Sequence, residues 1–327
     1  MCGIFGYFDS HKNILSDERL KVMGDAILYR GPDGSGCYHN ERMAVALGNQ
    51  RLAILDIEHG QQPFYSEDRN IIVVQNGEIF NHVELAEDLN KDGFHCITHC
   101  DTEVILRIYQ RDGIKGLSLL NGMFAIAIYD VNEQALYLVR DRVGEKPLYF
   151  SNEEGRLIFS SEIKSIVGVS DSKSVCVEAM NQFFAFNYVP PPLTIFSGIK
   201  HVMPGHYLRV SQGVVEDHCW WDLSSIKTQE RSEEEWISLF NNILDDAVRI
   251  RLRSDVAFGA FLSGGVDSSS VVGLMSKHLD TAVNTFCIGF DDKKYDESLY
   301  AQEAAERFNT HHTMKKVQAN LINLWPM

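Results

Sequence analysis

The chain has 327 residues, of which 45% are apolar and 23% are charged. These fractions are ordinary for a folded globular protein and exclude a largely disordered, collagen-like or disulfide-stapled chain. The 45 Asp and Glu residues outnumber the 30 Lys and Arg residues, which gives a net charge of −15. So acidic a chain is repelled by phosphate backbones and has no local basic cluster, so we expect no nucleic-acid partner.

The sequence carries no sign of a membrane or of an oxidising compartment. No run approaches the ~18 apolar residues that a membrane span requires, and the first residues, MCGIFG, do not resemble a secretory signal. The seven cysteines are scattered along the chain. An odd, scattered set is typical of reduced thiols, so we expect a cytoplasmic protein without a membrane contact.

The first two hundred residues alternate short apolar runs with turn residues. Apolar spacing predicts helices near residues 17–28, 83–89 and 102–110. Strands are expected as a pair over 43–55, a single strand at 71–74, and a hairpin of 122–129 with 135–139. Many strands with helices before and between them predict a layered α+β domain over residues 1–210.

The composition becomes polar after residue 210, and we place a linker at 211–231. Ser232 and Glu235 form a capping box, which predicts the start of a helix at the head of a second domain, 232–327. The apolar residues of this helix recur at helical spacing from Trp236 to Val248, so we expect it to lie on a core. Buried strands are expected at 256–262 and 285–290, with a third strand near 311–317, and they alternate with helices at 268–279 and 297–308. This alternation is typical of a doubly wound parallel α/β sheet.

The loop SGGVDSS at residues 263–269 lies between a predicted strand and a predicted helix. Gly264 and Gly265 allow a ligand to approach the backbone closely, and the free N–H groups of the helix start favour an anion such as phosphate. Ser263 and Ser268 add hydroxyl donors, and Asp267 is suited to hold Mg²⁺ beside a phosphate. The alternative is a glycine-rich turn in which Ser and Asp act only as caps.

Cys2 is the second candidate for chemistry. A side chain this small permits removal of Met1, which would place a thiol and a free α-amine on one residue. An uncharged amine can take the thiol proton near neutral pH, so the residue would supply both nucleophile and base. The alternative is a small apolar residue that begins a strand, and the choice depends on what accompanies Cys2.

Several polar residues elsewhere in the first domain suit an amino-acid substrate. The Asn76 amide and the Gly77 N–H are suited to an oxyanion hole. Arg51 could bind a substrate carboxylate through a forked pair of hydrogen bonds, and Glu78 and Asp101 could bind a substrate ammonium. Taken alone, each is more often a turn residue or a solvated charge.

Taken together, these segments closely resemble the glutaminase domain of class II, or N-terminal-nucleophile, glutamine amidotransferases. The resemblance rests on MCGIFG (1–6), RGPD (30–33), RL (51–52), NGEIFN (76–81), DTE (101–103) and RDRVGEKPLY (140–149). The later segment FLSGGVDSS (261–269) is similar to the ATP-pyrophosphatase loop of glutamine-hydrolysing asparagine synthetases.

The resemblance implies a four-layer αββα N-terminal-nucleophile fold, followed by part of an α/β ATP-pyrophosphatase domain. It implies that Cys2 attacks the glutamine amide and that Asn76 and Gly77 stabilise the oxyanion. Glutamine would be bound by Arg51, Asn76, Glu78 and Asp101. ATP would be bound by Leu262, Ser263, Gly264, Gly265, Asp267, Ser268 and Ile288, with Mg²⁺ at Asp267.

The implied reaction is that of a glutamine-dependent asparagine synthetase. Ammonia from glutamine would pass to aspartate activated by ATP, giving asparagine, glutamate, AMP and diphosphate. The expected partners are therefore glutamine, aspartate and ATP, and a homodimer is left open.

The sequence departs from the family at several points. Tyr29 and Asn49 stand where the family often has His, which would tune the glutamine pocket. A later SGEGxDE-type loop, which completes the family's ATP and aspartate site, does not occur before Met327. We therefore expect a truncated synthetase half, with a thin sheet that has an exposed edge and an uncovered face. Two alternatives remain open: another acceptor carboxylate, such as a sugar acid, or a non-catalytic fragment that pairs with a full-length synthetase.

Overall fold

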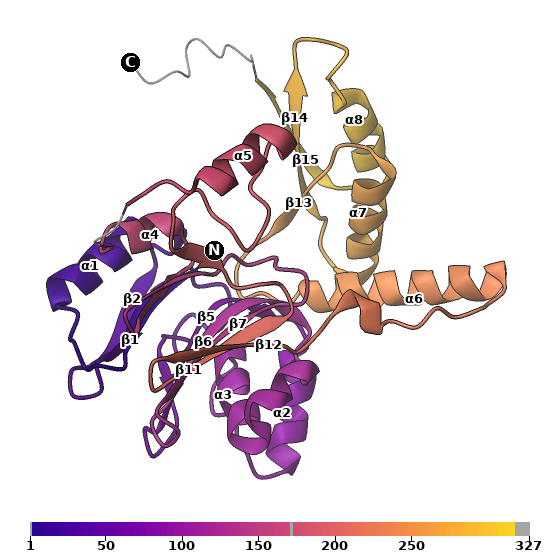
Figure 1. Ribbon diagram of the computed structural model, residues 1–327. Coiled ribbons are helices and arrows are strands. Elements are labelled where there is room, and N and C mark those ends of the chain that lie inside the picture. The colour runs from indigo at the N-terminus through magenta and orange to yellow at the C-terminus, as the bar shows by residue number, and fades with distance from the viewer. Residues whose placement is uncertain (1, 171–172, 318–327) are drawn as a thin grey trace. The chain divides into compact units, whose positions relative to one another are not determined.

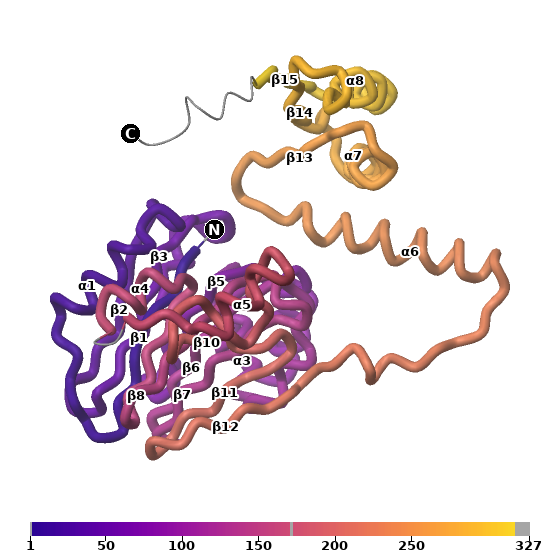
Figure 2. Tube along the Cα trace, turned by 45° about the horizontal axis from the view of Figure 1, so that its top comes forward, coloured from indigo at the N-terminus to yellow at the C-terminus, as the bar shows by residue number. Residues whose placement is uncertain are grey.

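The computed structural model describes residues 2–170 and 173–317. The chain forms two compact units, which divide between Thr228 and Gln229. The first unit contains antiparallel sheets, and the second contains a parallel sheet (Figure 1). Figure 2 follows the same elements as a trace from β1 to β15.

Two six-stranded antiparallel sheets form the centre of the first unit. The first sheet has the order β10 (Ile199–His201), β8 (Tyr149–Glu153), β9 (Arg156–Ser160), β1 (Gly3–Asp9), β3 (Val45–Arg51) and β2 (Gly34–Asn40). The second has the order β12 (Val214–Cys219), β11 (His206–Ser211), β7 (Ala135–Arg140), β6 (Gly122–Asp130), β5 (Ile71–Ile79) and β4 (Phe64–Tyr65).

Helices cover the outer face of each sheet. Helices α1 (Asp17–Ala26) and α4 (Ile163–Val167) pack on the first sheet, and α2 (His82–Lys91) and α3 (Asp101–Asp112) pack on the second. The unit also contains α5 (Val177–Phe186) and the short 3₁₀ helices Leu28–Arg30, Gly113–Leu119 and Leu223–Ser225. Within residues 2–170 and 173–317, no helix combines the length and the apolar character that a bilayer crossing requires.

Strand alternation explains why four layers form. On β1, Ile4 and Phe8 pack between the sheets, whereas Phe5 and Tyr7 pack under α1 and α4. Alternate residues of a strand point to opposite faces, so a strand that is apolar at every position is buried on both. The predicted four-layer αββα architecture is therefore confirmed.

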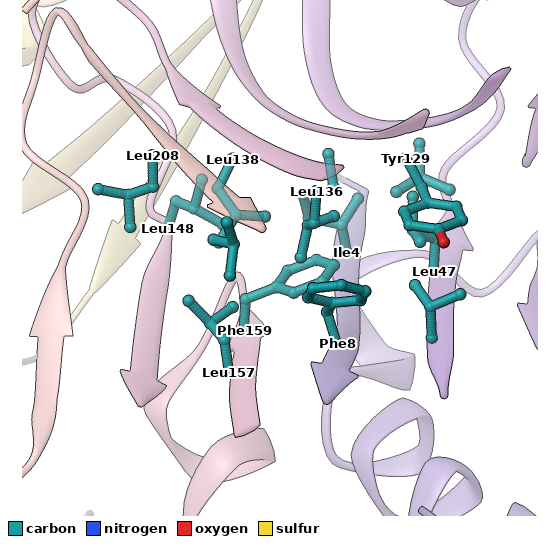
Figure 3. Packing of buried hydrophobic residues seen from close by; sticks show 14 of the residues in the cluster. Ile4, Phe8, Leu47, Tyr129, Leu136, Leu138, Leu148, Leu157, Phe159 and Leu208 are labelled. Carbon is teal, nitrogen blue, oxygen red and sulfur yellow. The ribbon is translucent and has the colours of Figure 1, made fainter. Parts of the chain in front are cut away.

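The core between the sheets is built from large side chains that meet from both sides. Figure 3 shows Phe159 and Leu157 of β9 beside Ile4 and Phe8 of β1, with Leu136 and Leu138 of β7 opposite. Phe159, on a central strand of the first sheet, is completely buried. This core holds the two sheets, and therefore their strand ends, in one fixed arrangement.

Two local predictions for the first unit are wrong. Residues 43–55 were expected to form two strands, but only β3 lies there, and it pairs with β2. Ala44 has a φ of 50° in the turn before β3, and the chain leaves the sheet after Arg51. Residues 214–219 were placed in the linker, but they form β12, a largely exposed edge strand without an apolar pattern.

The second unit contains a parallel sheet of β13 (Gly259–Phe261), β14 (Asn284–Phe290) and β15 (His311–Val317). Helices α7 (Val266–His278) and α8 (Ser298–Arg307) connect the strands and pack on one face. On β14, Cys287 is buried under them, whereas Phe286 and Ile288 are exposed. The expected third strand and thin sheet are therefore present. In the described part of the second unit the strands are buried on one face only, which agrees with the expected uncovered face.

Helix α6 (Glu233–Arg251) begins with the predicted capping box, in which Ser232 accepts from the Glu235 amide and the Glu235 carboxylate accepts from the Ser232 amide. The expectation that its apolar face lies on a core is wrong for its first half. Phe240 is 64% exposed, and only Val248 and Ile250 are buried. Val248 packs with Met275 of α7, so the described part of the unit covers only the end of the helix.

Phe159→Ala should destabilise the first unit by about 3–5 kcal/mol, because it removes a buried ring and leaves a cavity between the sheets. Hydrogen exchange of β1 and β9 measures this loss in the first unit alone. Phe184→Ala, on α5, is the matched control. Its ring is 76% exposed, so the change should stay within about 0.5 kcal/mol. Equal losses for the two variants would contradict this account of the core.

Candidate active site

A cavity of about 110 Å³ lies where several strands and a helix of the first unit end. Its lining includes every residue predicted for the glutamine site: Cys2, Arg51, Asn76, Gly77, Glu78 and Asp101. These residues come from four separate segments of the chain: the position directly before β1, the end of β3, the end of β5 and the start of α3. The fold therefore brings together groups that lie up to a hundred positions apart.

Cys2 lies directly before β1, and pairing of β1 with β3 places it next to the end of β3. The Leu52 amide donates to the Cys2 Sγ at 3.3 Å, and Arg30 Nε donates to the Cys2 carbonyl oxygen at 2.9 Å. Arg30 is itself fixed by an ion pair of 2.8 Å with Glu162. The backbone of Cys2 is thus held in place, and its thiol faces the cavity.

The surroundings of the Cys2 thiol favour its neutral form. Burial raises the pKa of the Cys2 thiol, and the hydrogen bond from Leu52 offsets this only in part. Since the thiolate is the nucleophilic form of cysteine, a reaction at this sulfur requires a nearby base.

Asn76 and Gly77 lie at the end of β5, across from β6. The Asn76 Nδ2 donates to Ser161 Oγ at 3.4 Å, and the same hydroxyl accepts the Ile4 amide at 3.0 Å. Ser161 therefore ties Asn76 to the strand that follows Cys2. At Gly77, a Cβ atom would lie 2.0 Å from the Met123 carbonyl oxygen, so only glycine permits this approach of β5 to β6.

The guanidinium of Arg51 is fixed by the loop that follows β3. Its Nη2 donates to the carbonyl oxygens of Leu55 and Asp56 at 2.8 and 2.7 Å, and its Nη1 donates to that of Ile57 at 3.2 Å. The side chain is buried. Because carbonyl oxygens solvate the cation without neutralising it, a positive charge remains at the cavity wall.

Glu78 and Asp101 place two carboxylates at the same cavity. Asp101 accepts the Ile79 amide at 2.9 Å and the Gln75 Nε2 at 3.1 Å. Burial raises the pKa of Asp101. Burial, and then the charge of Asp101, raise the pKa of Glu78, whereas Lys146 opposes this. The two acids therefore share a site in which a cationic group would be stabilised.

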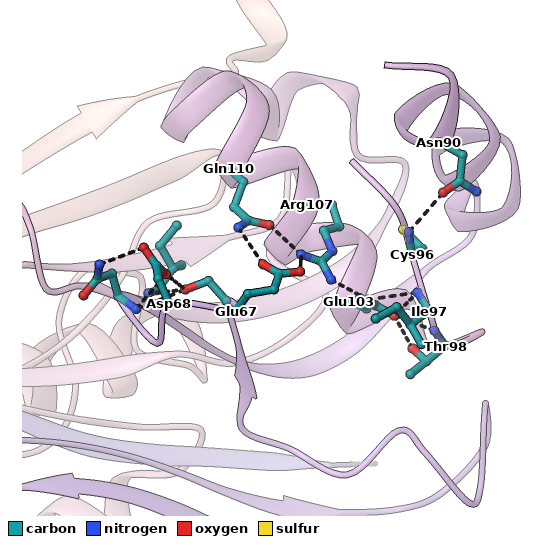
Figure 4. Close-up of polar contacts among 12 residues, drawn as sticks. Glu67, Asp68, Asn90, Cys96, Ile97, Thr98, Glu103, Arg107 and Gln110 are labelled. Atoms are coloured by element: carbon teal, nitrogen blue, oxygen red, sulfur yellow. Dashed lines mark hydrogen bonds and ion pairs between the residues drawn. The ribbon is translucent and has the colours of Figure 1, made fainter. Parts of the chain in front are cut away.

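Glu103 holds the loop that leads into Asp101. Its carboxylate accepts the backbone amides of Ile97 and Thr98 and the Thr98 hydroxyl, at 2.6–3.1 Å. Arg107 pairs with Glu103 at 3.0 Å and also contacts Glu67 (Figure 4). This buried ion pair fixes the chain just before α3 and so fixes where Asp101 starts the helix.

Sequence reasoning assigned no role to one charged residue of the cavity, Lys146. It belongs to the segment RDRVGEKPLY, which contributed to the resemblance only as a whole. No local sequence pattern distinguishes a buried lysine from a solvated one. The only feature of the sequence that could have pointed to Lys146 as a site residue is its position within this segment.

The loop at 263–269 lies between β13 and α7 in the second unit. Gly264 has a φ of 82°, and a Cβ there would lie 2.3 Å from the Tyr300 carbonyl carbon, so glycine is required. Ser263 Oγ and Ser268 Oγ are 3.1 Å apart. Gly265 caps α7 without a side-chain hydrogen bond, and Asp267 lies in the first turn of the helix. The geometry is compatible with an anion at this helix start.

The structure does not bring together the side chains of Leu262 and Ile288, which the resemblance assigns to one adenine pocket. Leu262 packs in the core with Val272 and Cys287. Ile288 follows Cys287 on β14 and therefore points to the opposite, exposed face. The two side chains therefore lie on opposite faces of the sheet, and the adenine site at these positions stays a prediction.

Comparison with known proteins finds a family match for each unit. Residues 1–221 match the family described as "Glutamine amidotransferase domain". The chain belongs to the glutamine amidotransferase family. Residues 239–326 match the family described as "Asparagine synthase".

Curated relatives agree with this assignment, and a solved structure shares the fold. The chain is 34% identical to asparagine synthetase [glutamine-hydrolyzing] 1 of Bacillus subtilis, over 97% of this chain and 50% of the relative. It is 36% identical to a putative asparagine synthetase [glutamine-hydrolyzing] 2 of Methanocaldococcus jannaschii, over 95% of this chain and 64% of the relative. The structure of "the allosteric regulatory enzyme of purine biosynthesis" shares the fold, with a TM-score of 0.50, 16% identity, and coverage of 96% of this chain and 65% of that one. This chain therefore spans about half to two thirds of the lengths of these relatives.

Glu103→Gln should loosen the loop before Asp101, because it leaves the buried Arg107 without its internal partner. Breaking a buried ion pair costs about 3–5 kcal/mol. Faster hydrogen exchange in residues 94–101 measures the effect. Glu67→Gln is the matched control, since Glu67 is the solvent-exposed partner of the same arginine and its pair should contribute less than about 1 kcal/mol. Unchanged exchange in Glu103→Gln would show that the ion pair does not fix this loop.

Proposed function

We propose that this chain hydrolyses the side-chain amide of glutamine at Cys2 and releases ammonia for transfer to a carboxylate activated by ATP. The observation that carries the proposal is the cavity of the first unit, where a thiol, an amide, a guanidinium and two carboxylates from four segments meet. Each group would be unremarkable alone. Together they match every part of free glutamine.

The charges of the cavity suit the two ends of the substrate. Arg51 would bind the α-carboxylate, because its fixed guanidinium keeps a positive charge at the wall. Glu78 and Asp101 would bind the α-ammonium. Since the site would bind both the α-carboxylate and the α-ammonium, we propose that the substrate is free glutamine rather than a glutamine residue within a protein.

The reaction would proceed in two balanced steps. The Cys2 sulfur attacks the amide carbon, and the carbonyl oxygen becomes an oxyanion that accepts hydrogen bonds from Asn76 Nδ2 and the Gly77 N–H. The C–N bond then breaks, and the nitrogen leaves as ammonia after taking the proton lost by the thiol. Water attacks the resulting glutamyl thioester in the second step, which releases glutamate and restores the thiol.

The base would be the α-amine of Cys2 itself, freed by removal of residue 1. Burial raises the pKa of the thiol, so little thiolate is present before substrate binds. An amine on the same residue is always within reach of the sulfur and needs no second side chain.

Cys2→Ala should lower glutamate release from glutamine by more than about 10³-fold, because the attacking atom is lost. A form of the chain in which an uncleavable peptide precedes Cys2 should be equally inactive, because its amine is an amide and cannot accept a proton. Both are measured by quantifying glutamate and ammonia after incubation with glutamine.

Cys37→Ala is the control for this experiment, since Cys37 is an exposed cysteine outside the cavity. It should retain full activity. Glutamate release that survives Cys2→Ala would refute the proposed nucleophile. Release by the blocked chain would refute the proposed base and leave the nucleophile standing.

For the second unit we propose ATP binding at the 263–269 loop, with aspartate as the acceptor and asparagine as the product. The match of residues 239–326 to the asparagine synthase family supports this. Ser263, Gly264, Gly265 and Ser268 would hold the diphosphate through amides and hydroxyls. Leu262 and Ile288 remain proposed only as backbone neighbours of adenine, because their side chains lie on opposite faces.

Mg²⁺ is proposed at Asp267. In the described part of the chain, no group of three or more His, Cys, Asp and Glu residues is arranged to hold a metal. Mg²⁺ at nucleotide sites needs only one or two protein carboxylates, because phosphates and water supply the other ligands. Asp267, in the first turn of α7, fits that mode, and the ion would neutralise phosphate charge there.

Two proposals concern the surroundings of the protein. We propose the cytoplasm as its compartment, because all seven cysteines are free. A homodimer is proposed as its assembly.

ATP should bind more tightly with Mg²⁺ than with EDTA, and Asp267→Asn should remove this difference because it removes the proposed metal ligand. Calorimetric titration of the chain with ATP in the two buffers measures both affinities. Asp280→Asn, at an exposed position after α7, should behave as wild type. An Asp267→Asn variant that keeps the full Mg²⁺ dependence would contradict the assignment.

A further inference from the structure

Lys146 is a buried ammonium at the glutamine cavity. It lies on the loop after β7, is 5% exposed, and lines the same cavity as Cys2, Glu78 and Asp101. A buried cation is costly unless anions or dipoles compensate it, so its presence at this wall needs a reason.

The loop that carries Lys146 is fixed by hydrogen bonds to both the amide and the carbonyl group of this residue. The Lys146 amide donates to Asp141 Oδ2 at 2.9 Å, and Arg140 Nε donates to the Lys146 carbonyl oxygen at 3.0 Å. The carboxylate of Asp141 also accepts the amides of Phe124 and Glu145, at 3.2 and 2.9 Å. The loop is therefore built to hold this lysine at the cavity, since its backbone cannot shift without breaking several buried hydrogen bonds.

The charges around Lys146 point to Glu78 as its counterpart in the cavity. Burial lowers the pKa of Lys146, and Glu78, Glu145 and Asp141 oppose this, whereas Arg30 adds to it. Glu145 and Asp141 belong to the same loop, whereas Glu78 comes from β5 and lines the same cavity as Lys146. Glu78 in turn experiences Asp101 and Lys146 as charged neighbours.

We propose that Lys146 is a positioning residue of the glutamine site, which keeps Glu78 ionised and in place as the acceptor for the substrate α-ammonium. The inference rests on the proposed glutaminase function and adds a residue to it. With Lys146, the cavity holds two cations, Arg51 and Lys146, and two carboxylates, Glu78 and Asp101. A zwitterionic amino acid can therefore bind without changing the net charge of the cavity. Without it, Glu78 and Asp101 face each other as like charges, and one takes up a proton.

The test is Lys146→Met, which keeps an unbranched side chain one atom shorter and removes its charge. The pH dependence of kcat/KM for glutamine reports groups of the free enzyme. Since Lys146 favours the ionised form of Glu78, its loss should move the acidic limb of that profile to higher pH by about one unit. Below the new limb KM should rise about tenfold, while kcat changes little because the thiol and the oxyanion donors remain.

Three variants separate positioning from packing. Lys146→Arg should restore the wild-type acidic limb, and Lys115→Met, at an exposed lysine, should leave it unchanged. Glu78→Gln should already lack this limb, so adding Lys146→Met to it should cause little further rise in KM. A Lys146→Met variant that loses thermal stability but keeps the wild-type profile would overturn the proposal.

A binding experiment makes the result independent of turnover. In the Cys2→Ala background, glutamine affinity is measured by calorimetry from pH 5.5 to 8.5, with and without Lys146→Met. A pH-dependent loss of affinity in the double variant supports the positioning role, and parallel curves refute it. If the wild-type chain binds glutamine but releases no glutamate, the proposed glutaminase function is refuted. The comparison of glutamine affinity with and without Lys146→Met then still decides the role of Lys146.

Discussion

The burial of opposite charges around one small cavity is the constraint on which the rest of the first unit depends. Arg51, Lys146, Glu78 and Asp101 all reach this cavity, and charges removed from water are costly unless each has fixed partners. The fold supplies these partners mainly from backbone: carbonyls for Arg51 and amides for Asp101. Such groups are in place only if the strand ends do not move. Two sheets packed over a shared apolar core hold the strand ends in place better than loops alone.

The grouping of the candidate residues at one cavity was predictable from sequence where these residues lie in short segments of unusual composition. Asn76 and Gly77 interrupt an apolar run, and Cys2 stands beside a removable residue, so each is visible without a structure. Lys146 was not, because its burial depends on a carboxylate five positions earlier, at Asp141, that gathers the backbone around it. The identity of a charged residue is local information, whereas its burial depends on the tertiary structure.

The same distinction explains the errors in the fold. Strands β5, β6 and β7 were found because apolar side chains recur along them, but β2 and β12 are edge strands with few buried residues and gave no pattern. Helix α6 was located correctly, down to its capping box, yet its apolar face is largely exposed. Periodicity shows which face of a helix is apolar, but burial needs a neighbour that the periodicity does not specify. Leu262 and Ile288 were paired by resemblance, and strand alternation separates them.

The placement of Cys2 connects these electrostatic arguments to the chemistry. Burial raises the pKa of the Cys2 thiol and so favours its neutral form, which would protect the proposed nucleophile when no substrate is present. A base supplied by a separate side chain would add another charge to a cavity whose charges already balance. An α-amine on the same residue avoids this, because it is uncharged when it accepts the proton and adds no buried side chain. The cavity is thus best suited to a nucleophile that carries its own base. Arg30 fixes the carbonyl of Cys2, directly before β1, and the Leu52 amide donates to its sulfur.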